Sequence, residues 1–314
     1  MGFLEDHILR LAGVTEASAL ACFPLIGKGD GEGADRLAVD AMRAAFQCLP
    51  LSIRVVIGEG ERDKAPRLYT GEKLGDFKSS LKVDVAVDPL EGTALCARGE
   101  GGALSVMALA PRGSLFMAPD IYMKKIACGP KAAKAIDLKA STRDNILAVA
   151  SALGKKPEFM SVGVLDRPRH EKMISEIRET GASVYLVEDG DVALALNTVL
   201  SSLDLLMGTG GAPEGVLAAV ALKCLGGGFQ GQLVFKNDEE EQRAGNVGVK
   251  DLHKIWTRDE LVKEEGIFCA TGVTTGSLVK GIQEEGADLI THTFILTSHS
   301  KRTLIHQRFI PSPV

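Results

Sequence analysis

The segment that most constrains this chain is an apolar strand followed at once by two carboxylates and a hydroxyl. Residues 83–87 read Val-Asp-Val-Ala-Val, and residues 88–93 read Asp-Pro-Leu-Glu-Gly-Thr. We expect the strand to stop there, because proline lacks the N–H that a sheet ladder needs and glycine permits a tight turn. Asp88, Glu91 and Thr93 would then share one bend. Oxygen ligands of this kind suit Mg²⁺ or Mn²⁺, which polarise phosphate and activate water, so the segment predicts part of a metal-dependent phosphate site.

The overall composition excludes several classes of protein. With 36 basic and 41 acidic residues the formal charge is −5, and aromatic residues make up only 5%, so we expect no nucleic-acid partner. The six cysteines are scattered singly, which is typical of reduced thiols in a cytosolic protein. We find no apolar segment that predicts a membrane span, and acidic residues near the start argue against a signal peptide. We therefore expect a cytoplasmic protein without a membrane partner.

Hydrophobic periodicity divides the chain into two stretches of different character. The first predicts a helix over 6–26, a second helix with Asp35 in its first turn and Pro50 at its end, strands over 53–57 and 83–87, and a hairpin of 103–110 with 114–117. The second alternates strands over 161–165, 183–187 and 203–207 with helices over 170–180, 192–199 and 213–225. Such alternation predicts a mostly parallel sheet covered by helices. We place the seam between two lobes near residues 135–150.

Acidic residues recur where predicted strands end. These clusters are Glu59, Glu61 and Asp63 after the first strand, Asp88 and Glu91 after the second, and Asp189 and Asp191 after the strand 183–187. Ligands of open α/β sheets gather beyond the carboxyl ends of strands, so we expect the three clusters to converge. Carboxylates packed so closely repel one another unless cations neutralise them. Each cluster therefore strengthens the interpretation of the other clusters as metal ligands.

Two further loops point to phosphate. Residues 208–215 join a strand to a long apolar helix, but Pro213 takes the third glycine position of a dinucleotide loop, which leaves an anion site at the helix start with Glu214 beside it. Arg167, Pro168 and Arg169 follow the strand 161–165 and suit bidentate phosphate binding, and we expect His170 to cap the next helix. His292, His299 and His306 recur every seven residues, which switches faces in a strand and does not favour zinc.

Together these motifs resemble the class II fructose-1,6-bisphosphatases (GlpX-type), within the lithium-sensitive sugar-phosphatase superfamily. The matching motifs extend over nearly the whole chain; beyond those above they include residues 56–61 (Val-Ile-Gly-Glu-Gly-Glu), 68–72 and 118–123. The resemblance implies an α/β fold with layers in the order α/β/α/β/α and two lobes around a metal-binding cleft. We expect residues 1–140 to form the metal-binding catalytic lobe and residues 141–314 the sugar-phosphate-binding lobe.

The resemblance also implies a role for each motif residue. It implies that Mg²⁺ or Mn²⁺ is held by Asp35, Glu59, Asp88, Glu91 and Glu214. It implies that Asp63 and Thr93 are catalytic, with Thr93 and a carboxylate such as Asp35 positioning the attacking water. The residues implied to bind fructose 1,6-bisphosphate are Glu91, Gly92, Thr93, Tyr122, Arg167, Pro168, Arg169, Asp189, Gly190, Asp191 and Gly211. We assign the arginines to the distal phosphate, and Asp189 and Asp191 to sugar hydroxyls.

The implied activity is hydrolysis of the 1-phosphate of fructose 1,6-bisphosphate by metal-activated water, in gluconeogenesis, by a homo-oligomer (dimer or tetramer). Activity on sedoheptulose 1,7-bisphosphate, alone or as well, is an alternative. The chain departs from the family pattern at Gly31, where family members carry a lysine that would bind the cleaved phosphate. Unless Lys28 replaces that lysine, a catalytically inactive sugar-phosphate sensor is a further alternative.

Overall fold

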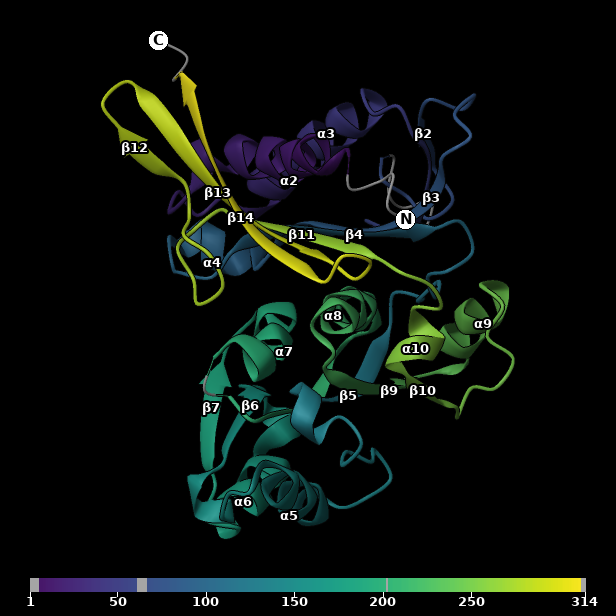
Figure 1. Ribbon diagram of the computed structural model, residues 1–314, viewed down its shortest axis with the longest axis vertical. Helices are drawn as coiled ribbons and strands as arrows, with labels where there is room; N and C mark the ends of the chain where they lie inside the picture. The colour runs from purple at the N-terminus through teal and green to yellow at the C-terminus, as the bar shows by residue number, and fades with distance from the viewer. Residues whose placement is uncertain (1–5, 61–66, 202, 312–314) are drawn as a thin grey trace. The chain divides into compact units, whose positions relative to one another are not determined.

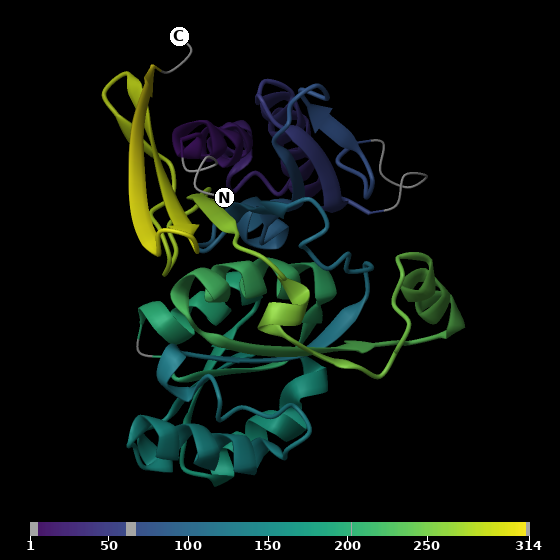
Figure 2. The ribbon, with the colours of Figure 1, turned by 45° about the vertical axis from the view of Figure 1, so that its right-hand side comes forward.

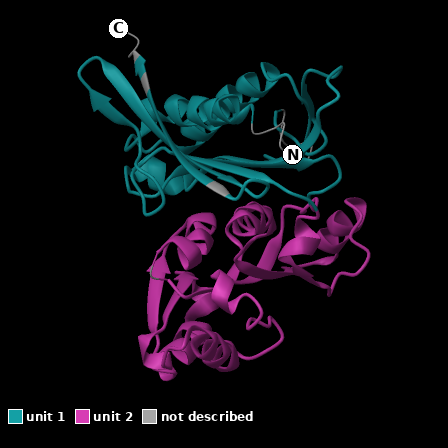
Figure 3. Ribbon diagram, viewed as in Figure 1, with its two compact units in different colours: residues 1–115, 264–314 teal, residues 116–263 magenta. Residues whose placement is uncertain are grey.

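The computed structural model describes residues 6–60, 67–201 and 203–311, and it divides into two compact units. Unit 1 comprises residues 1–115 and 264–314, and unit 2 comprises residues 116–263 (Figure 3). The predicted boundary at residue 140 therefore differs from the division that the contacts give. The difference has two long-range causes. The strand at 104–111 pairs with the strand at 267–272, which returns the C-terminal segment to the first sheet. The strand at 122–128 pairs with the strands at 205–211 and 228–234, which places it in the second sheet.

Unit 1 is built on one eight-stranded sheet. Its strands are β1 (Ser52–Ile57), β2 (Lys73–Gly75), β3 (Lys82–Glu91), β4 (Leu104–Pro111), β11 (Ile267–Gly272), β12 (Gln283–Glu285), β13 (Asp288–Thr297) and β14 (Arg302–Pro311). The order is β12-β13-β11-β4-β3-β1-β2, with β14 paired to β13. Among the described strands of this unit, only β1 and β3 pair in parallel. Helices α2 (Ile8–Cys22) and α3 (Gly31–Gln47) lie together along one face (Figure 1), and α4 (Thr93–Arg98) follows β3.

The N-terminal helix corrects one expectation from the sequence. The stretch Ile8–Leu25, which is α2 with the 3-10 turn after it, has a mean hydropathy of 1.4 over 18 residues, so an apolar segment of membrane-spanning length is present. Half of it is buried within the structure, where Leu11, Ala12 and Val14 pack into the core of unit 1. Buried polar groups such as Ser18, which donates to the carbonyl oxygens of Ala38 and Pro89, fix it there. The helix is therefore a core element of this unit.

Strand β3 runs further than its proline predicts. It continues to Glu91, because Asp88 still pairs with Val106 of β4 and Glu91 pairs with Leu104. The register shifts between these two pairs, so Pro89 falls in a bulge where no ladder N–H is required. The expectation that the strand stops before Asp88 was wrong, and the consequence is that both acidic residues belong to a strand end of the sheet itself.

A buried carboxylate fastens β3 to its neighbours. Asp84 is fully buried, and both of its oxygens accept from Arg54 of β1, at 2.8 Å each. Its Oδ1 also lies 3.0 Å from Nε of Arg112, and its Oδ2 accepts from the backbone N–H of Gly113 at 2.6 Å. A buried charge is tolerated only when it is paired and hydrogen-bonded in this way. The network therefore fixes the strand that carries Asp88 and Glu91.

Unit 2 contains a six-stranded sheet between two layers of helices (Figures 1 and 2). Its strands, in the order β10-β9-β5-β8-β6-β7, are β5 (Tyr122–Cys128), β6 (Ser161–Leu165), β7 (Ser183–Val187), β8 (Leu205–Gly211), β9 (Gly228–Val234) and β10 (Ile255–Thr257). One face packs against α5 (Thr142–Leu153) and α6 (Glu171–Glu179), and the other carries α7 (Asp191–Leu200) and α8 (Ala212–Leu225). The remaining helices are α9 (Asp238–Asn246) and α10 (Arg258–Leu261).

The alternating elements predicted for the second half are confirmed, but the sheets are mixed. Strands β6, β7 and β8 are parallel, as the β-α-β pattern indicates, whereas β5 runs antiparallel to β8 and β9. The predicted hairpin of 103–110 with 114–117 is wrong, because β4 pairs with β3 and β11 instead. Two sheets with their helical layers confirm the α/β class.

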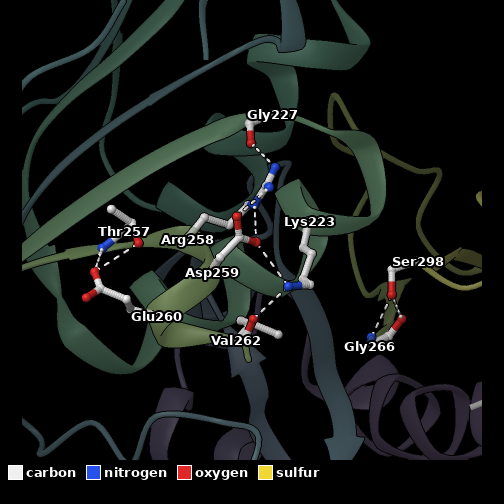
Figure 4. Close-up of polar contacts among 9 residues, drawn as sticks. All are labelled: Lys223, Gly227, Thr257, Arg258, Asp259, Glu260, Val262, Gly266 and Ser298. Carbon is white, nitrogen blue, oxygen red and sulfur yellow. Dashed lines mark hydrogen bonds and ion pairs between the residues drawn. The ribbon is translucent and has the colours of Figure 1, made fainter. Parts of the chain in front are cut away.

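Polar side chains tie α10 to the end of α8. Arg258 donates to the carbonyl oxygen of Gly227 at 2.6 Å and pairs with Asp259 (Figure 4). Lys223 of α8 donates to the same aspartate at 3.0 Å and to the carbonyl oxygen of Val262 at 2.8 Å. Glu260 accepts from the N–H and the hydroxyl of Thr257, which closes the first turn of the short helix.

The Asp84 network generates the first prediction. Replacing Asp84 by alanine leaves Arg54 and Arg112 without their shared partner, so we expect the free energy of unfolding to fall by about 2–4 kcal/mol. Urea unfolding measures this loss. The matched control is Glu100→Ala, which removes an exposed ion pair with Arg98 and should leave the midpoint unchanged. Equal midpoints for the two variants would contradict the role assigned to Asp84.

Candidate active site

Two of the predicted acidic clusters lie side by side in unit 1. Strands β1 and β3 are parallel neighbours, and Ile57 pairs with Ala86, so Glu59 follows one strand end while Asp88 stands on the next. The backbone N–H of Glu59 donates to the carbonyl oxygen of Leu68 at 3.0 Å. Oδ1 of Asp88 accepts from the N–H of Leu90 at 3.1 Å, inside the bulge. Both carboxylates are half-buried at the same edge of the sheet.

The end of β3 turns directly into α4 and places three predicted site residues in a row. Glu91 is buried, with 4% of its surface exposed. Gly92 has a left-handed backbone (φ 81°), which a side chain would strain, and precedes the first residue of the helix. That residue is Thr93, whose Oγ1 donates to the carbonyl oxygen of Leu90 at 3.0 Å. The turn therefore holds a carboxylate and a hydroxyl at fixed positions beside a helix N-terminus.

Helix α3 begins earlier than the sequence predicts. Asp30 is its N-cap, and Oδ1 accepts from the N–H of Gly33 at 2.8 Å. Asp35 therefore lies beyond the first turn, and burial raises the pKa of its carboxyl. A Cβ on Gly31, the position of the family lysine, would lie 3.2 Å from Cγ2 of Thr93. The departure from the family pattern thus sits against the predicted catalytic threonine.

The third acidic cluster belongs to unit 2. Gly190 has a left-handed backbone (φ 90°), and Asp191 after it begins α7. Asp191 is 8% exposed and forms an ion pair with Nζ of Lys125, which is itself 4% exposed. The three clusters do not follow strands of one sheet, because β7 lies in a different sheet from β1 and β3, and their convergence stays a prediction.

Sequence reasoning missed Lys125. No motif marks it, but alternation along β5 gives a signal that could have found it. Met123, Lys125 and Ala127 share one buried face of β5, where a strand normally places apolar side chains. A lysine at such a position requires a buried acidic partner, and Asp191 supplies it.

Glu214 projects from the first turn of α8 into the same part of unit 2. Burial, and then the neighbouring charge of Asp191, raise the pKa of its carboxyl to about 7, while Lys125 acts in the opposite direction. Among the described residues, none forms a hydrogen bond with its buried Oε2. A Cβ on Gly211 would collide with this carboxylate, so glycine is needed there to make room for it.

A single histidine braces the arginine loop. The buried ring of His170 donates from Nδ1 to the carbonyl oxygen of Leu165 at 2.7 Å, and its Nε2 accepts from the N–H of Thr209 at 2.9 Å. His170 occupies the N-cap position of α6, as expected, but its side chain does not cap the helix, because both ring nitrogens are used in this way. Arg169 donates from Nε and Nη2 to the carbonyl oxygen of Thr209, at 3.0 and 2.7 Å. The two contacts fasten the predicted phosphate loop to the end of β8.

The predicted site residues thus form two groups. Unit 1 carries Asp35, Glu59, Asp88, Glu91, Gly92 and Thr93, and unit 2 carries Tyr122, Arg167, Pro168, Arg169, Asp189, Gly190, Asp191, Gly211 and Glu214. Glu61 and Asp63 lie outside the described residues. No group of three or more histidine, cysteine or acidic side chains within the described part forms a ready-made metal cage. The donors are nevertheless carboxylate oxygens, and a buried one at Glu214 has no proton donor, which fits a hard divalent cation.

Comparison with known proteins identifies the family. Residues 5–309 match the family described as bacterial fructose-1,6-bisphosphatase, glpX-encoded. The chain belongs to this family. It is a metal-dependent phosphatase of carbohydrate metabolism, which confirms the resemblance stated from its motifs.

Two curated relatives are similar along almost their whole length. A D-fructose 1,6-bisphosphatase class 2/sedoheptulose 1,7-bisphosphatase of Synechococcus elongatus is 39% identical, with 93% of this chain and 92% of the relative covered. A protein of the same name from Crocosphaera subtropica is 40% identical over the same shares. A solved structure of an extragenic suppressor from Pyrococcus furiosus aligns with 64% of this chain and 74% of that one at 15% identity and a TM-score of 0.35.

The bond between His170 and Thr209 generates a pH prediction. Burial, the largest cause, lowers the pKa of His170 from 6.5, and the neutral ring is the form that can accept from the Thr209 amide. A depressed pKa contributes stability that is present above pH 6.5 and is lost as the pH falls. When the pH falls from 7.5 to 5.5, we expect the free energy of unfolding of the wild type to decrease by up to about 1.4 kcal/mol more than that of His170→Gln, because glutamine does not titrate. Parallel pH profiles in urea unfolding would contradict this assignment.

Proposed function

We propose that this protein hydrolyses the 1-phosphate of fructose 1,6-bisphosphate to give fructose 6-phosphate and phosphate, with Mg²⁺ or Mn²⁺ as its cofactor. The observation that carries the proposal is the family match over residues 5–309 together with retention of every predicted metal ligand. A release assay for inorganic phosphate with Mn²⁺ tests it directly. No release from pure substrate at saturating Mn²⁺ would favour the inactive sugar-phosphate sensor instead.

The carboxylates at the ends of β1 and β3 are the proposed metal ligands of unit 1, and Asp35 of α3 is a further one. Glu214 is the carboxylate of unit 2 that the resemblance adds to this set. A divalent cation held by such oxygens supplies positive charge for the phosphoryl group and acidifies water. Thr93 orients the attacking water through its hydroxyl, together with a carboxylate such as Asp35.

Unit 2 carries the residues that we propose to bind the sugar. Arg167 and Arg169 bind the distal phosphate, because guanidinium groups match phosphate geometry and keep their charge. Asp189 and Asp191 accept hydrogen bonds from sugar hydroxyls. The ion pair with Lys125 supports this role, because it holds the buried Asp191 in one position.

Activity on sedoheptulose 1,7-bisphosphate is the second candidate. The relatives that are 39–40% identical carry both activities in their names, and this observation favours a dual specificity. The ratio of kcat/KM for the two bisphosphates decides it. We also propose a cytoplasmic homo-oligomer, a dimer or tetramer, acting in gluconeogenesis.

Thr93 offers the sharpest test of the chemistry. Because its hydroxyl acts on the attacking water, Thr93→Ala should lower kcat by about 100-fold or more while KM changes by less than about 3-fold. Steady-state kinetics at saturating Mn²⁺ measures both. Thr93→Ser keeps the hydroxyl and is the matched control, which should retain most of the activity. A loss confined to KM would contradict the role in the transition state.

A further inference from the structure

Two cations cover the ring of Tyr122 in unit 2. Tyr122 is the first residue of β5, and Cζ of Arg169 lies 4.8 Å from the centre of its ring. Nζ of Lys236 lies 4.1 Å from the same ring centre. Tyr122 and Arg169 are predicted substrate-binding residues, but no motif of the sequence singles out Lys236. It follows β9, and Val234 of that strand pairs with Tyr122.

Neither of these cations has a carboxylate partner among the described residues. Arg169 donates to a backbone carbonyl, that of Thr209, and the ammonium group of Lys236 rests on the aromatic ring. Glu240, on the helix after Lys236, accepts from its backbone N–H at 2.7 Å, while its other oxygen faces Arg243 at 3.9 Å. In a chain with a net charge of −5, adjacent cations without a counter-charge indicate a site for an anion.

A second lysine in the same unit shows what a compensated contact looks like. Lys254 also lies over an aromatic ring, with Nζ 4.2 Å from the ring centre of Trp256. Its ammonium group is 2.9 Å from Oε1 of Glu260, so its charge is already paired. The two lysines contact their aromatic rings in the same way, but only Lys254 has a counter-charge. Lys236 is therefore the candidate ligand-binding group.

The backbone around Lys236 is fixed in advance. Its N–H is held by Glu240, and the next residue, Asn237, caps α9 by accepting from the N–H of Glu240 at 3.0 Å. Arg169, the other cation at this ring, is braced by its two bonds to the carbonyl oxygen of Thr209. A binding site that is ordered before the ligand arrives loses less conformational entropy on binding.

We propose that Lys236 is a further ligand of the distal phosphate of the sugar, together with Arg167 and Arg169. The proposal rests on the proposed function, since it assigns a residue to the non-reacting phosphate of that substrate. An ammonium group adds a point charge to the bidentate contacts of an arginine. Lys236 then makes the protein prefer sugars with two phosphates over those that carry only the reacting one.

The test replaces Lys236 by methionine, which removes the ammonium charge and keeps an unbranched apolar side chain. Lys236→Met should raise KM for fructose 1,6-bisphosphate at least about 10-fold and change kcat less than about 2-fold, because the distal contact is equally strong in ground and transition states. Calorimetry should show fructose 6-phosphate binding weakened by a similar factor and fructose 1-phosphate binding unchanged. Lys236→Arg should restore most of the affinity. Lys254→Met, the matched control, should behave as the wild type in all three measurements.

The outcomes separate this inference from the proposed function. A wild type that neither hydrolyses fructose 1,6-bisphosphate nor binds fructose 6-phosphate would refute the function itself. A wild type that does both, with Lys236→Met indistinguishable from it, would overturn the assignment of Lys236 alone. Equal weakening of fructose 6-phosphate and fructose 1-phosphate binding would also overturn it, because the effect would then not depend on the distal phosphate.

Discussion

Buried carboxylates that need a positive charge are the constraint on which this structure depends. Removing an ionised carboxylate from water costs several kcal/mol unless a cation compensates it. The protein supplies that cation at Asp84, through Arg54 and Arg112, and at Asp191, through Lys125. At Glu214 the compensation is incomplete, and the pKa of its carboxyl rises to about 7. A divalent ion would complete it.

The folded chain prepares this arrangement with short, tight turns at strand ends. Gly92 and Gly190 each take a left-handed backbone just before a helix, and each is followed by a predicted site residue at the first helical position. The two loops lie in different units, so the same local solution is used for Thr93 and for Asp191. In both places the strand end holds the turn in position, and the turn sets the position of the functional side chain.

The parts of the fold that local patterns specify could be predicted. The strands at 161–165 and 183–187 and the helix between them appear where the periodicity places them. The pairing of β4 with β11 could not be predicted, because it joins residues more than 150 positions apart and no local pattern records it. The return of residues 264–314 to unit 1 follows from this pairing, so local patterns do not predict it either.

The same distinction holds for the candidate site. Motif residues such as Asp88, Glu91 and Arg169 could be named from the sequence, because their spacing carries chemical meaning. Lys236 could not be named, since a single lysine has many roles and only its neighbours in space reveal this one. For Lys125 the sequence holds a signal of burial, a lysine among apolar strand residues, but it does not identify Asp191 as the partner. The continuation of β3 past Pro89 could not be predicted either, because a bulge removes the need for a ladder N–H at the proline.

The most direct test of the account is the binding of Mn²⁺ to the metal-free protein, followed by electron paramagnetic resonance at pH 8. We predict that the wild type binds Mn²⁺ and that Glu91→Gln and Glu214→Gln each weaken binding at least about 10-fold, because a neutral amide is a poorer ligand than a carboxylate. Glu100→Gln, an exposed acid paired with Arg98, should bind as the wild type does. Wild-type protein that binds no Mn²⁺, or site variants that match Glu100→Gln, would contradict the account.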